Sequence, residues 1–477
     1  YIPTKTAPGH ASIYTGTTAT NHGVIANDWY QKSLNGQVYC VSDNTVKSVG
    51  SNNSAGQMSP HRMLVTTFPD ENRLFTQMKG KTIAISIKDR GSILPGGHTA
   101  NGAYWFDMTG TGNWISSSFY MNELPKWVED FNESNITEGY FRNWNTLYDI
   151  ETYTESGPDL TTFEGGYSAK NGVGFPYDLK ALAPANGNYN IIAESPFGNS
   201  LTTDFVLAAI QAEQLGLDKF TDVLAVSYSS TDKVGHNFGP NSKEVEDTFI
   251  RLDKEIERLL NHLDKVIGKG EYTVFLTSDH GTMDVPNYLK ENRIPAGLFD
   301  LNKMRADLNQ ELQEKYNIPG LILSTINNQI YLDDKKMLEK GIDKSIVAKE
   351  LVTRLLQYEE IDKAFIGEEL LYLSNGDNLA SDFANGYYPK RSGDILFEMN
   401  PSYFKDVEWN RTGTDHGSGF NYDTHIPLIF YGKGIKRGST FRKTSVIDIA
   451  PTMSALLGIG LPNASTGEIL EFVIQNN

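Results

Sequence analysis

The sequence predicts an α/β fold, with a mostly parallel central sheet, helices on both faces of that sheet, and inserted cap segments. Three observations predict this fold. Short and almost uninterrupted apolar runs recur far apart in the chain, as is typical of parallel strands buried on both faces. Amphipathic helical stretches separate these runs, which gives the strand–helix–strand order of a covered sheet. Polar residues follow several of the runs, at the strand ends where open α/β sheets collect functional groups.

The strands of the sheet are expected at four short runs of mainly β-branched, aliphatic and aromatic residues. These runs are residues 82–86, 223–227, 272–276 and 426–430. Because Pro427 lacks a backbone N–H, we expect the fourth run to lie near the start of a strand or at the edge of the sheet.

Two helical stretches are expected to cover this sheet. The first spans 205–215 and stops before Gly216, a residue type that commonly follows a helix. The second follows Asn241, which can cap the helix together with Glu244 three residues later. Its apolar residues are spaced alternately four and three apart as far as Leu263, which predicts one continuous apolar face.

The whole chain, residues 1–477, is expected to form one domain with two insertions. The first insertion, about 100–195, is full of Trp, Tyr, Asn and Gly and shows little periodicity. The second, about 286–405, contains two charged helical stretches, 302–315 and 344–358, around a strand-like run at 329–332. We expect both insertions to form cap regions outside the main sheet.

The composition excludes several classes of protein. With 39% hydrophobic and 11% aromatic residues, the chain can bury a large core, which excludes disorder as its main state. A net charge of −17 argues against generic binding to nucleic acid or anionic membranes, because such binding needs clustered Lys and Arg. No apolar run approaches the roughly 18 residues of a membrane-spanning helix. Cys40 is the single cysteine, expected free and half-buried, so no intrachain disulfide can form.

Three polar loops next to predicted strands carry candidate metal ligands. Asp232 and His236 are four apart, so one helical turn would place them on one face. Asp279 and His280 follow the next strand, and His416 precedes the last one. Asp and His are the ligand types of zinc and similar metals. One such pair alone is more often a helix cap or a structural histidine, but three clusters at the same sheet edge predict a metal site.

Two cations follow the strand at 82–86. In an extended chain Lys88 and Arg90 would project to the same side. Two cations beside a metal site fit an oxyanion such as phosphate or sulfate. The alternative is an ordinary solvated pair of charges.

The N-terminal segment offers a hydroxyl at a predicted helix start. A short helix is expected to hold Pro8 in its first turn and to end near Gly16. The backbone N–H groups of a helix start favour negative charge, and metal coordination could activate a threonine there. The alternative is that Thr4 or Thr6 only caps the helix, and the two roles can coexist.

Several motifs together resemble the alkaline phosphatase superfamily. They occur in the family's order and span nearly the whole chain: Pro3–Thr4–Lys5–Thr6–Ala7–Pro8–Gly9–His10, Asn27–Asp28–Trp29–Tyr30, Thr231–Asp232 with His236–Asn237, Ser278–Asp279–His280–Gly281, Thr414–Asp415–His416–Gly417–Ser418, and the helix-like segment from Asp448 to Ile459. Within the superfamily, Ile87–Lys88–Asp89–Arg90 most resembles the phosphate-irrepressible bacterial phosphomonoesterases with a threonine nucleophile.

The resemblance implies a zinc-dependent phosphomonoester hydrolase that forms a phosphothreonine and acts on small phosphate monoesters. The implied roles are: Thr6 as the nucleophile; Asp232, His236 and His416 as ligands of one Zn²⁺; Asp279 and His280 as ligands of a second Zn²⁺; and Asn27, Lys88 and Arg90 as binders of the phosphate oxygens. It also implies a periplasmic or secreted protein. The resemblance says nothing of the physiological substrate or the oligomeric state.

One feature of the family is not found in this sequence. The family places a further carboxylate ligand upstream of the nucleophile, at the end of a strand, whereas this sequence starts five residues before Thr6. We therefore expect an upstream segment, tens of residues long, that ends a strand with an Asp ligand.

The sequence leaves three alternative functions. A sulfatase shares the fold, but its motif begins with a modified Cys or Ser and continues to Pro and Arg, which the segment from Thr6 to His10 does not match. A phosphodiesterase or nucleotide pyrophosphatase shares the threonine motif, but is not expected to carry Lys88 and Arg90. An inactive, metal-poor binding protein of the same fold is the third alternative, and metal content distinguishes it from the enzyme.

Overall fold

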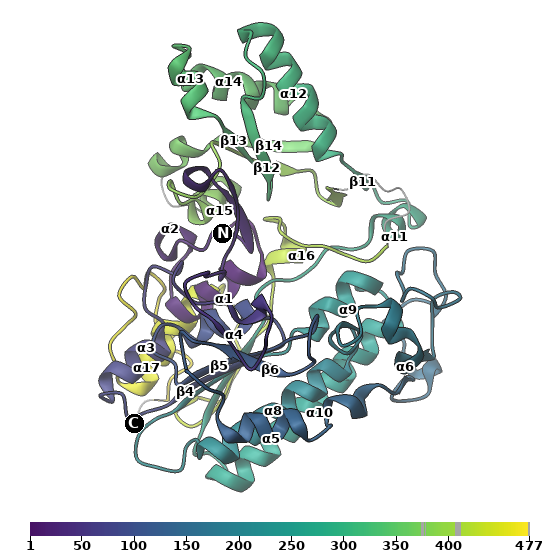
Figure 1. The fold of residues 1–477 in the computed structure, drawn as a ribbon, viewed down its shortest axis with the longest axis vertical. Coiled ribbons are helices and arrows are strands. Elements are labelled where there is room, and N and C mark those ends of the chain that lie inside the picture. Colours follow the sequence, from purple (N-terminus) through teal and green to yellow (C-terminus); the bar gives the residue numbers. More distant parts are fainter. Residues whose placement is uncertain (374–375, 377, 406–411, 476–477) are drawn as a thin grey trace.

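The computed structural model describes residues 1–373, 376, 378–405 and 412–475, and it has the predicted α/β class (Figure 1). The central sheet has the strand order β3–β6–β5–β4–β9. Its strands are β3 (Ser48–Val49), β4 (Thr82–Ser86), β5 (Gly102–Phe106), β6 (Trp114–Ser117) and β9 (Val223–Ser227). β4 runs parallel to β5 and β9, whereas β6 runs antiparallel to β5 and β3. The sheet is therefore mixed: β4 and β9 pair in parallel as predicted, and the antiparallel strands β6 and β3 at the other edge were not predicted.

Helices cover both faces of this sheet because side chains alternate along β4. Ile83 and Ile85 pack into one apolar core with Phe205 of α8, whereas Ala84 packs into another with Ala7 of α1 and Ile93 of α4. One layer contains α5 (Lys126–Glu133), α8 (Phe197–Glu213) and α10 (Lys243–Leu263), and the other contains α1 (Thr6–Thr15), α3 (Phe68–Phe75), α4 (Asp89–Gly96) and α17 (Ile449–Leu457) (Figure 1).

The first predicted insertion was placed too early in the chain. β5 and β6 lie within 100–195 but belong to the central sheet, where Trp105 and Trp114 are buried. Their residues are mainly aromatic or small and form no aliphatic run like those of the other strands, so no local pattern predicts them as strands. The rest of this segment is irregular. It contains β7 (Asn143–Trp144), β8 (Tyr177–Asp178), α6 (Leu179–Leu182) and α7 (Asn190–Ala193).

The second predicted insertion contains a sheet of its own. β12 (Ile322–Ile326), β13 (Gln329–Leu332), β15 (Ile395–Met399) and β14 (Ile361–Ile366) form an antiparallel sheet in that order. It packs around a separate apolar core with α12 (Leu301–Tyr316) and α14 (Lys344–Leu355). We call residues 286–405 the cap; its four-stranded sheet with α12 and α14 forms the uppermost part of Figure 1. Its other elements are α11 (Pro286–Glu291), β11 (Gly297–Leu298), α13 (Asp334–Glu339), α15 (Leu379–Gly386) and β16 (Tyr403–Phe404).

A two-stranded sheet joins β10 (Thr273–Thr277) to β17 (Leu428–Gly432) in antiparallel orientation. Both strands were predicted, one and two residues earlier in the chain, but β10 was expected to lie in a parallel sheet. β9 ends the five-stranded sheet, and β10 has β17 as its one strand partner in the part of the chain that the structure describes.

Two helix starts differ from the predicted ones. α10 is capped by Ser242, whose side chain accepts a hydrogen bond from the N–H of Val245, because Asn241 instead donates to Asp284. α8 begins eight residues before the predicted 205. No helix in the described ranges has the length and apolar character needed to cross a bilayer. Cys40 is fully buried, not half-buried.

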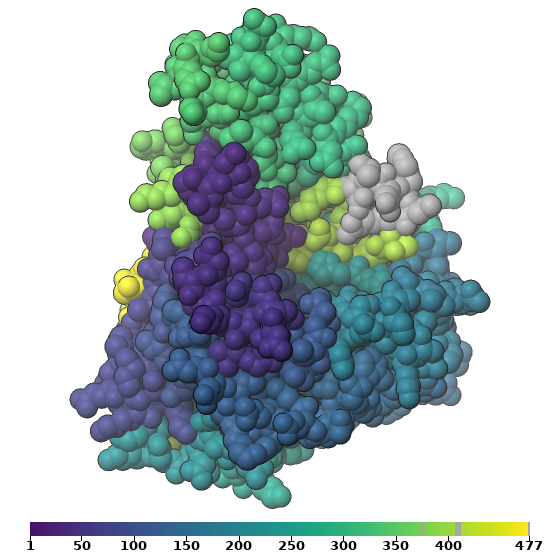
Figure 2. Space-filling view, viewed as in Figure 1, coloured from purple at the N-terminus to yellow at the C-terminus, as the bar shows by residue number. Residues whose placement is uncertain are grey.

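The N-terminal segment lies between the cap and the central sheet. In Figure 2 its side chains (purple) occupy the surface between the cap and the lower layer. This segment contains α1, α2 (Ala19–His22), β1 (Asp28–Gln31) and β2 (Gly36–Tyr39). Lys32, between β1 and β2, forms ion pairs with Asp334 and Asp394 of the cap at 2.6 and 2.7 Å. These contacts hold the cap against the segment that contains Thr6.

Candidate metal centre and phosphate site

The three predicted loops meet at one point. Asp232 and His236 lie one turn apart on α9 (Ser230–Phe238), with 3.4 Å between Asp232 Oδ1 and His236 Nε2. His416, before α16 (Asn421–Thr424), places its Nε2 3.7 Å from the same oxygen, and His280, after β10, places its Nε2 at 3.9 Å. One ligand atom from each of Asp232, His236 and His416 lies within 4.8 Å of the others.

Backbone carbonyls orient the three histidine rings. His236 Nδ1 lies 2.9 Å from the carbonyl oxygen of Thr414, His416 Nδ1 lies 2.7 Å from that of Thr4, and His280 Nδ1 lies 2.9 Å from that of Gly281. A carbonyl can only accept, so each Nδ1 donates its hydrogen and the neutral ring keeps a free lone pair on Nε2. This arrangement is the one that histidine ligands of metals usually have.

The donor set fits zinc. His280 Nε2 is buried and has no hydrogen-bond partner among the described residues, although Asp279 Oδ2 lies 3.4 Å away. A buried imidazole nitrogen without a partner costs free energy that a bound cation removes. Imidazole nitrogens with carboxylate oxygens are the ligands of catalytic zinc sites.

The charges around Asp232 keep it ionised. Burial raises the pKa of Asp232, but the Lys88 ammonium and then the nearby histidines outweigh burial and hold this pKa well below its usual value. Burial is also the main cause that lowers the pKa of His416, which is therefore neutral at pH 7. A charged carboxylate and a neutral imidazole are the protonation states that metal binding needs.

Asp279 connects the metal loops to α1. Its Oδ2 lies 3.4 Å from Nδ1 of His10, whose Nε2 bonds Ser227 Oγ at the end of β9. Burial raises the pKa of Asp279, but His280 and His10 outweigh it, so the net shift is downward. Gly9 permits the contact, because a Cβ there would lie 2.7 Å from that of Asp279.

Thr6 is the first residue of α1, and it is buried. The N-cap residue is Lys5 and forms no side-chain capping bond, whereas the Thr4 hydroxyl donates to the Ser418 carbonyl at 2.8 Å. Neither threonine therefore caps the helix, so the alternative role of Thr4 or Thr6 as a helix cap was wrong. Asn27 Oδ1 accepts a hydrogen bond from the N–H of Ala7 at 2.8 Å, which places Asn27 beside this helix start.

Lys88 and Arg90 are not in an extended segment. Lys88 is the N-cap of α4 and Arg90 lies in its first turn, so the expected extended spacing was wrong. The Lys88 ammonium pairs with Asp232. Burial lowers the pKa of Lys233, and the charges of Lys88 and Arg90 add to this shift although Glu194 opposes it. The positive charges of Lys88 and Arg90 therefore both reach the surroundings of Lys233.

Arg90 is held by a pair of side chains that the sequence did not predict. Its Nη1 donates to the Tyr39 hydroxyl at 2.9 Å, and that hydroxyl donates to Asp89 Oδ1 at 2.5 Å. Nε of Arg90 is buried without a hydrogen-bond partner among the described residues. An unpaired donor of this kind is suited to an incoming oxyanion.

Further residues that sequence reasoning missed orient the His416 loop. Lys5 Nζ donates to Asp415 Oδ1 at 3.0 Å and to the His416 carbonyl at 2.5 Å. The Asp423 carboxylate accepts hydrogen bonds from the N–H groups of Gly417 and Ser418 at 2.9 and 2.7 Å. Lys5 stood inside the motif around Thr6, whereas no local pattern identifies Asp423.

Comparisons with known proteins point to one family. Residues 1–419 match the family described as type I phosphodiesterase / nucleotide pyrophosphatase. The chain is 44% identical over 476 residues to alkaline phosphatase PhoV of Synechococcus elongatus, which covers 100% of this chain and 85% of that protein. It is 42% identical over 477 residues to alkaline phosphatase PafA of Elizabethkingia meningoseptica, covering 99% of this chain and 86% of that protein.

One further relative and two solved structures also match over the full length of this chain. A Myroides odoratus protein named calcium-transporting ATPase is 40% identical over 478 residues, covering 100% of this chain and 87% of that protein. The crystal structure of wild-type PafA matches with a TM-score of 0.95 and 41% identity, covering 100% of this chain and 90% of that chain. A PafA variant with a threonine, an asparagine, a lysine and an arginine replaced matches with a TM-score of 0.94 and 40% identity, with the same coverage.

Proposed function

This chain belongs to the type I phosphodiesterase / nucleotide pyrophosphatase family of the alkaline phosphatase superfamily, and it is an alkaline phosphatase. From this premise we propose that it hydrolyses phosphate monoesters with two bound zinc ions and Thr6 as the nucleophile. The observation that carries the proposal is the convergence of Asp232, His236, His280 and His416, with each histidine Nδ1 engaged by a carbonyl.

The described side chains provide two ligand groups. Asp232, His236 and His416 would hold one zinc ion, and Asp279 with His280 would hold the other. When bound, the two ions would lower the pKa of a coordinated hydroxyl and neutralise charge on the attacking and leaving oxygens.

Phosphoryl transfer through Thr6 then takes two steps. The Thr6 hydroxyl loses its proton and its oxygen forms a bond to phosphorus, while the bond from phosphorus to the ester oxygen breaks and the departing alcohol takes up a proton. Water then attacks the phosphothreonine, which releases phosphate and restores the hydroxyl. Because Thr6 stands at the first turn of α1, backbone N–H groups favour the negative charge at this position.

Asn27, Lys88 and Arg90 would bind the non-bridging oxygens. Lys88 pairs with Asp232 in the structure, and it would be available to phosphate if that carboxylate served as a metal ligand. The PafA variant supports these roles, because its four replaced residue types, in chain order Thr, Asn, Lys and Arg, are those of Thr6, Asn27, Lys88 and Arg90.

Two alternatives are less well supported. A phosphodiesterase would place a second ester group where Lys88 and Arg90 provide fixed positive charge, and that charge favours the dianionic monoester. An inactive binding protein has no need of three histidines whose Nε2 atoms turn toward one carboxylate. A periplasmic or secreted location is part of the proposal on family resemblance alone, and cell fractionation tests it.

Thr6→Ala tests the nucleophile. Wild-type protein mixed with a phosphate monoester and quenched in acid should gain the mass of one phosphoryl group, and Thr6→Ala should gain none. Thr4→Ala is the matched control, because the hydroxyl of Thr4 bonds the Ser418 carbonyl, and it should be phosphorylated like the wild type. Phosphorylation of Thr6→Ala would refute the assignment.

Metal content tests the enzyme against the binding protein. A metal analysis that finds close to two zinc ions per chain supports the enzyme, and one that finds one or none supports the binding protein.

A further inference from the structure

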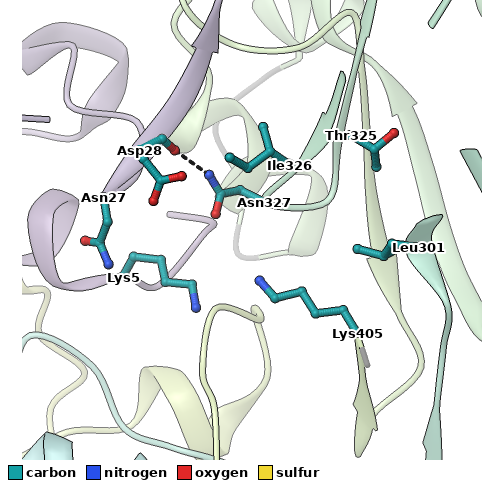
Figure 3. A pocket seen from close by; sticks show the side chains of 8 residues that line it. All are labelled: Lys5, Asn27, Asp28, Leu301, Thr325, Ile326, Asn327 and Lys405. Atoms are coloured by element: carbon teal, nitrogen blue, oxygen red, sulfur yellow. Dashed lines mark hydrogen bonds between the residues drawn. The ribbon is translucent and has the colours of Figure 1, made fainter. Parts of the chain in front are cut away.

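A cavity of about 340 Å³ lies between the cap and the segment that contains Thr6. One side of it consists of Lys5, Asn27 and Asp28, and the other consists of cap residues (Figure 3). The cap residues are Leu301, Thr325, Ile326, Asn327 and Lys405. Because Lys5 directly precedes Thr6 and Asn27 bonds the N–H of Ala7, the cavity opens beside the proposed nucleophile.

On the basis of the function proposed above, we propose that this cavity binds the leaving group of the substrate and selects an uncharged, polyhydroxylated alcohol, such as a sugar or a glycerol unit. A phosphate held next to Thr6 must direct its ester oxygen away from the nucleophile, because attack and departure are in line. Lys5 also bonds the carbonyl of His416, so the cavity lies on the side of the His416 ligand group.

The polar groups of the cavity include both donors and acceptors. The ammonium groups of Lys5 and Lys405 point toward each other, and the Asp28 carboxylate points to the same space (Figure 3). Asn327 donates its amide N–H to the Asp28 carbonyl at 2.6 Å, which leaves its Oδ1 as an acceptor. Sugar hydroxyls donate and accept at once, so a mixed set of this kind matches them.

The charges favour a neutral leaving group over an anionic one. Lys5 is paired with Asp415 at 3.0 Å. Asp415 is not part of the cavity wall, but it neutralises Lys5, so within the wall the Lys405 ammonium stands against the Asp28 carboxylate. A second phosphate on the leaving group would therefore find no net positive charge.

The size and the walls of the cavity set further limits. A volume of about 340 Å³ is at the lower end of small-molecule sites, so one ring or a short polyol fits and a long chain does not. Leu301 and Ile326 supply an apolar wall for the C–H face of a sugar. The walls are preformed, because Lys32 ties the N-terminal segment to Asp334 and Asp394 of the cap.

The test compares two substrates in matched variants. For the wild type, kcat/KM is measured with glucose 6-phosphate and with p-nitrophenyl phosphate, and the ratio of the two values is compared with that of Asp28→Ala. We expect this ratio to fall at least tenfold, because the Asp28 carboxylate that points into the cavity is lost (Figure 3). A ratio unchanged within twofold overturns the proposal. Thr353→Val on the cap and Asp130→Asn on α5, both exposed, are the controls and should leave the ratio unchanged.

A second substrate and the activity of the wild type itself distinguish the remaining outcomes of this test. A bisphosphorylated sugar preferred more than tenfold over glucose 6-phosphate, with the preference lost in Lys405→Gln, would overturn the neutral class in favour of an anionic one. A wild type that hydrolyses neither ester refutes the proposed function, whereas a wild type active on p-nitrophenyl phosphate with an unaffected ratio refutes the leaving-group site alone. Unfolding temperature and zinc content show that each variant is folded.

Discussion

Tyr39→Phe removes one hydroxyl that the structure places between Asp89 and Arg90. The phenol oxygen accepts from Arg90 Nη1 at 2.9 Å and donates to Asp89 at 2.5 Å. Burial lowers the pKa of Arg90, but Tyr39 and Asp89 outweigh burial and raise it, so the guanidinium stays charged. Without the hydroxyl, Arg90 keeps its charge but loses the group that orients it.

The size of the effect follows from the kind of hydrogen bond that is lost. Hydrogen bonds to charged groups contribute about 1.5–3 kcal/mol, which corresponds to roughly a 10- to 150-fold change in rate if the whole amount reaches the transition state. We expect kcat/KM for a phosphate monoester to fall about tenfold, because Arg90 can still approach the phosphate in a less favourable orientation. A methyl phosphodiester should lose less, because it presents less charge to Arg90.

A double-mutant cycle with Arg90→Ala separates orientation from general damage. If Tyr39 acts through Arg90, Tyr39→Phe should have little further effect in the Arg90→Ala background. Equal losses in both backgrounds, or equal losses on monoester and diester, would refute the reasoning. Tyr316→Phe is the matched control, because the Tyr316 hydroxyl also donates to a carboxylate, Glu350 at 2.8 Å, but lies on the cap.

Three more predictions concern charge, metal and pH. Lys88→Ala combined with Arg90→Ala should reduce monoester turnover far more than diester turnover, because fixed cations favour the more highly charged ester; equal losses in kcat/KM would contradict this. Chelation should abolish monoester hydrolysis and lower the unfolding temperature, and added Zn²⁺ should restore both; full activity in a protein shown to be metal-free would exclude the metal mechanism. Burial and then the charge of Glu244 raise the pKa of Glu164 from 4.5 to about 9, so its contribution to the free energy of unfolding is present below pH 4.5 and is lost as the pH rises to about 9. Glu164→Gln should flatten this decline in urea unfolding, whereas the exposed Glu151→Gln should not; an identical slope in both variants would show that Glu164 does not titrate in this way.

The local sequence pattern was sufficient to predict features that depend on a single strand or helix. The strands at Thr82–Ser86 and Val223–Ser227 were predicted at their observed bounds, because continuous apolar runs need no partner to be recognised. The spacing of Asp232 and His236 gave one helical face, and α9 has it. That the three loops converge followed from the single rule that functional groups collect at strand ends.

Contacts between distant segments could not be predicted in this way. The antiparallel pairing of β10 with β17 depends on where the chain returns after the cap, which no local run records. The extended spacing assumed for Lys88 and Arg90 failed because α4 begins directly after β4. Tyr39 and Lys5 reach their partners across 50 and 410 residues, so no window of sequence contains either pair.

The orientation of the histidine ligands also depends on contacts between distant segments, which local sequence cannot predict. The carbonyl that fixes the His416 ring belongs to Thr4, 412 residues away, and the one that fixes His236 belongs to Thr414. A motif specifies the ligand side chains, but the groups that select their tautomer are backbone atoms that every residue type carries. Substituting the side chain of Thr4 or Thr414 leaves the carbonyl in place, so a scan of substitutions would miss these contacts unless the backbone itself moved. Residue identity can therefore predict which side chains bind a metal here, while the fold alone determines that their Nε2 atoms face it.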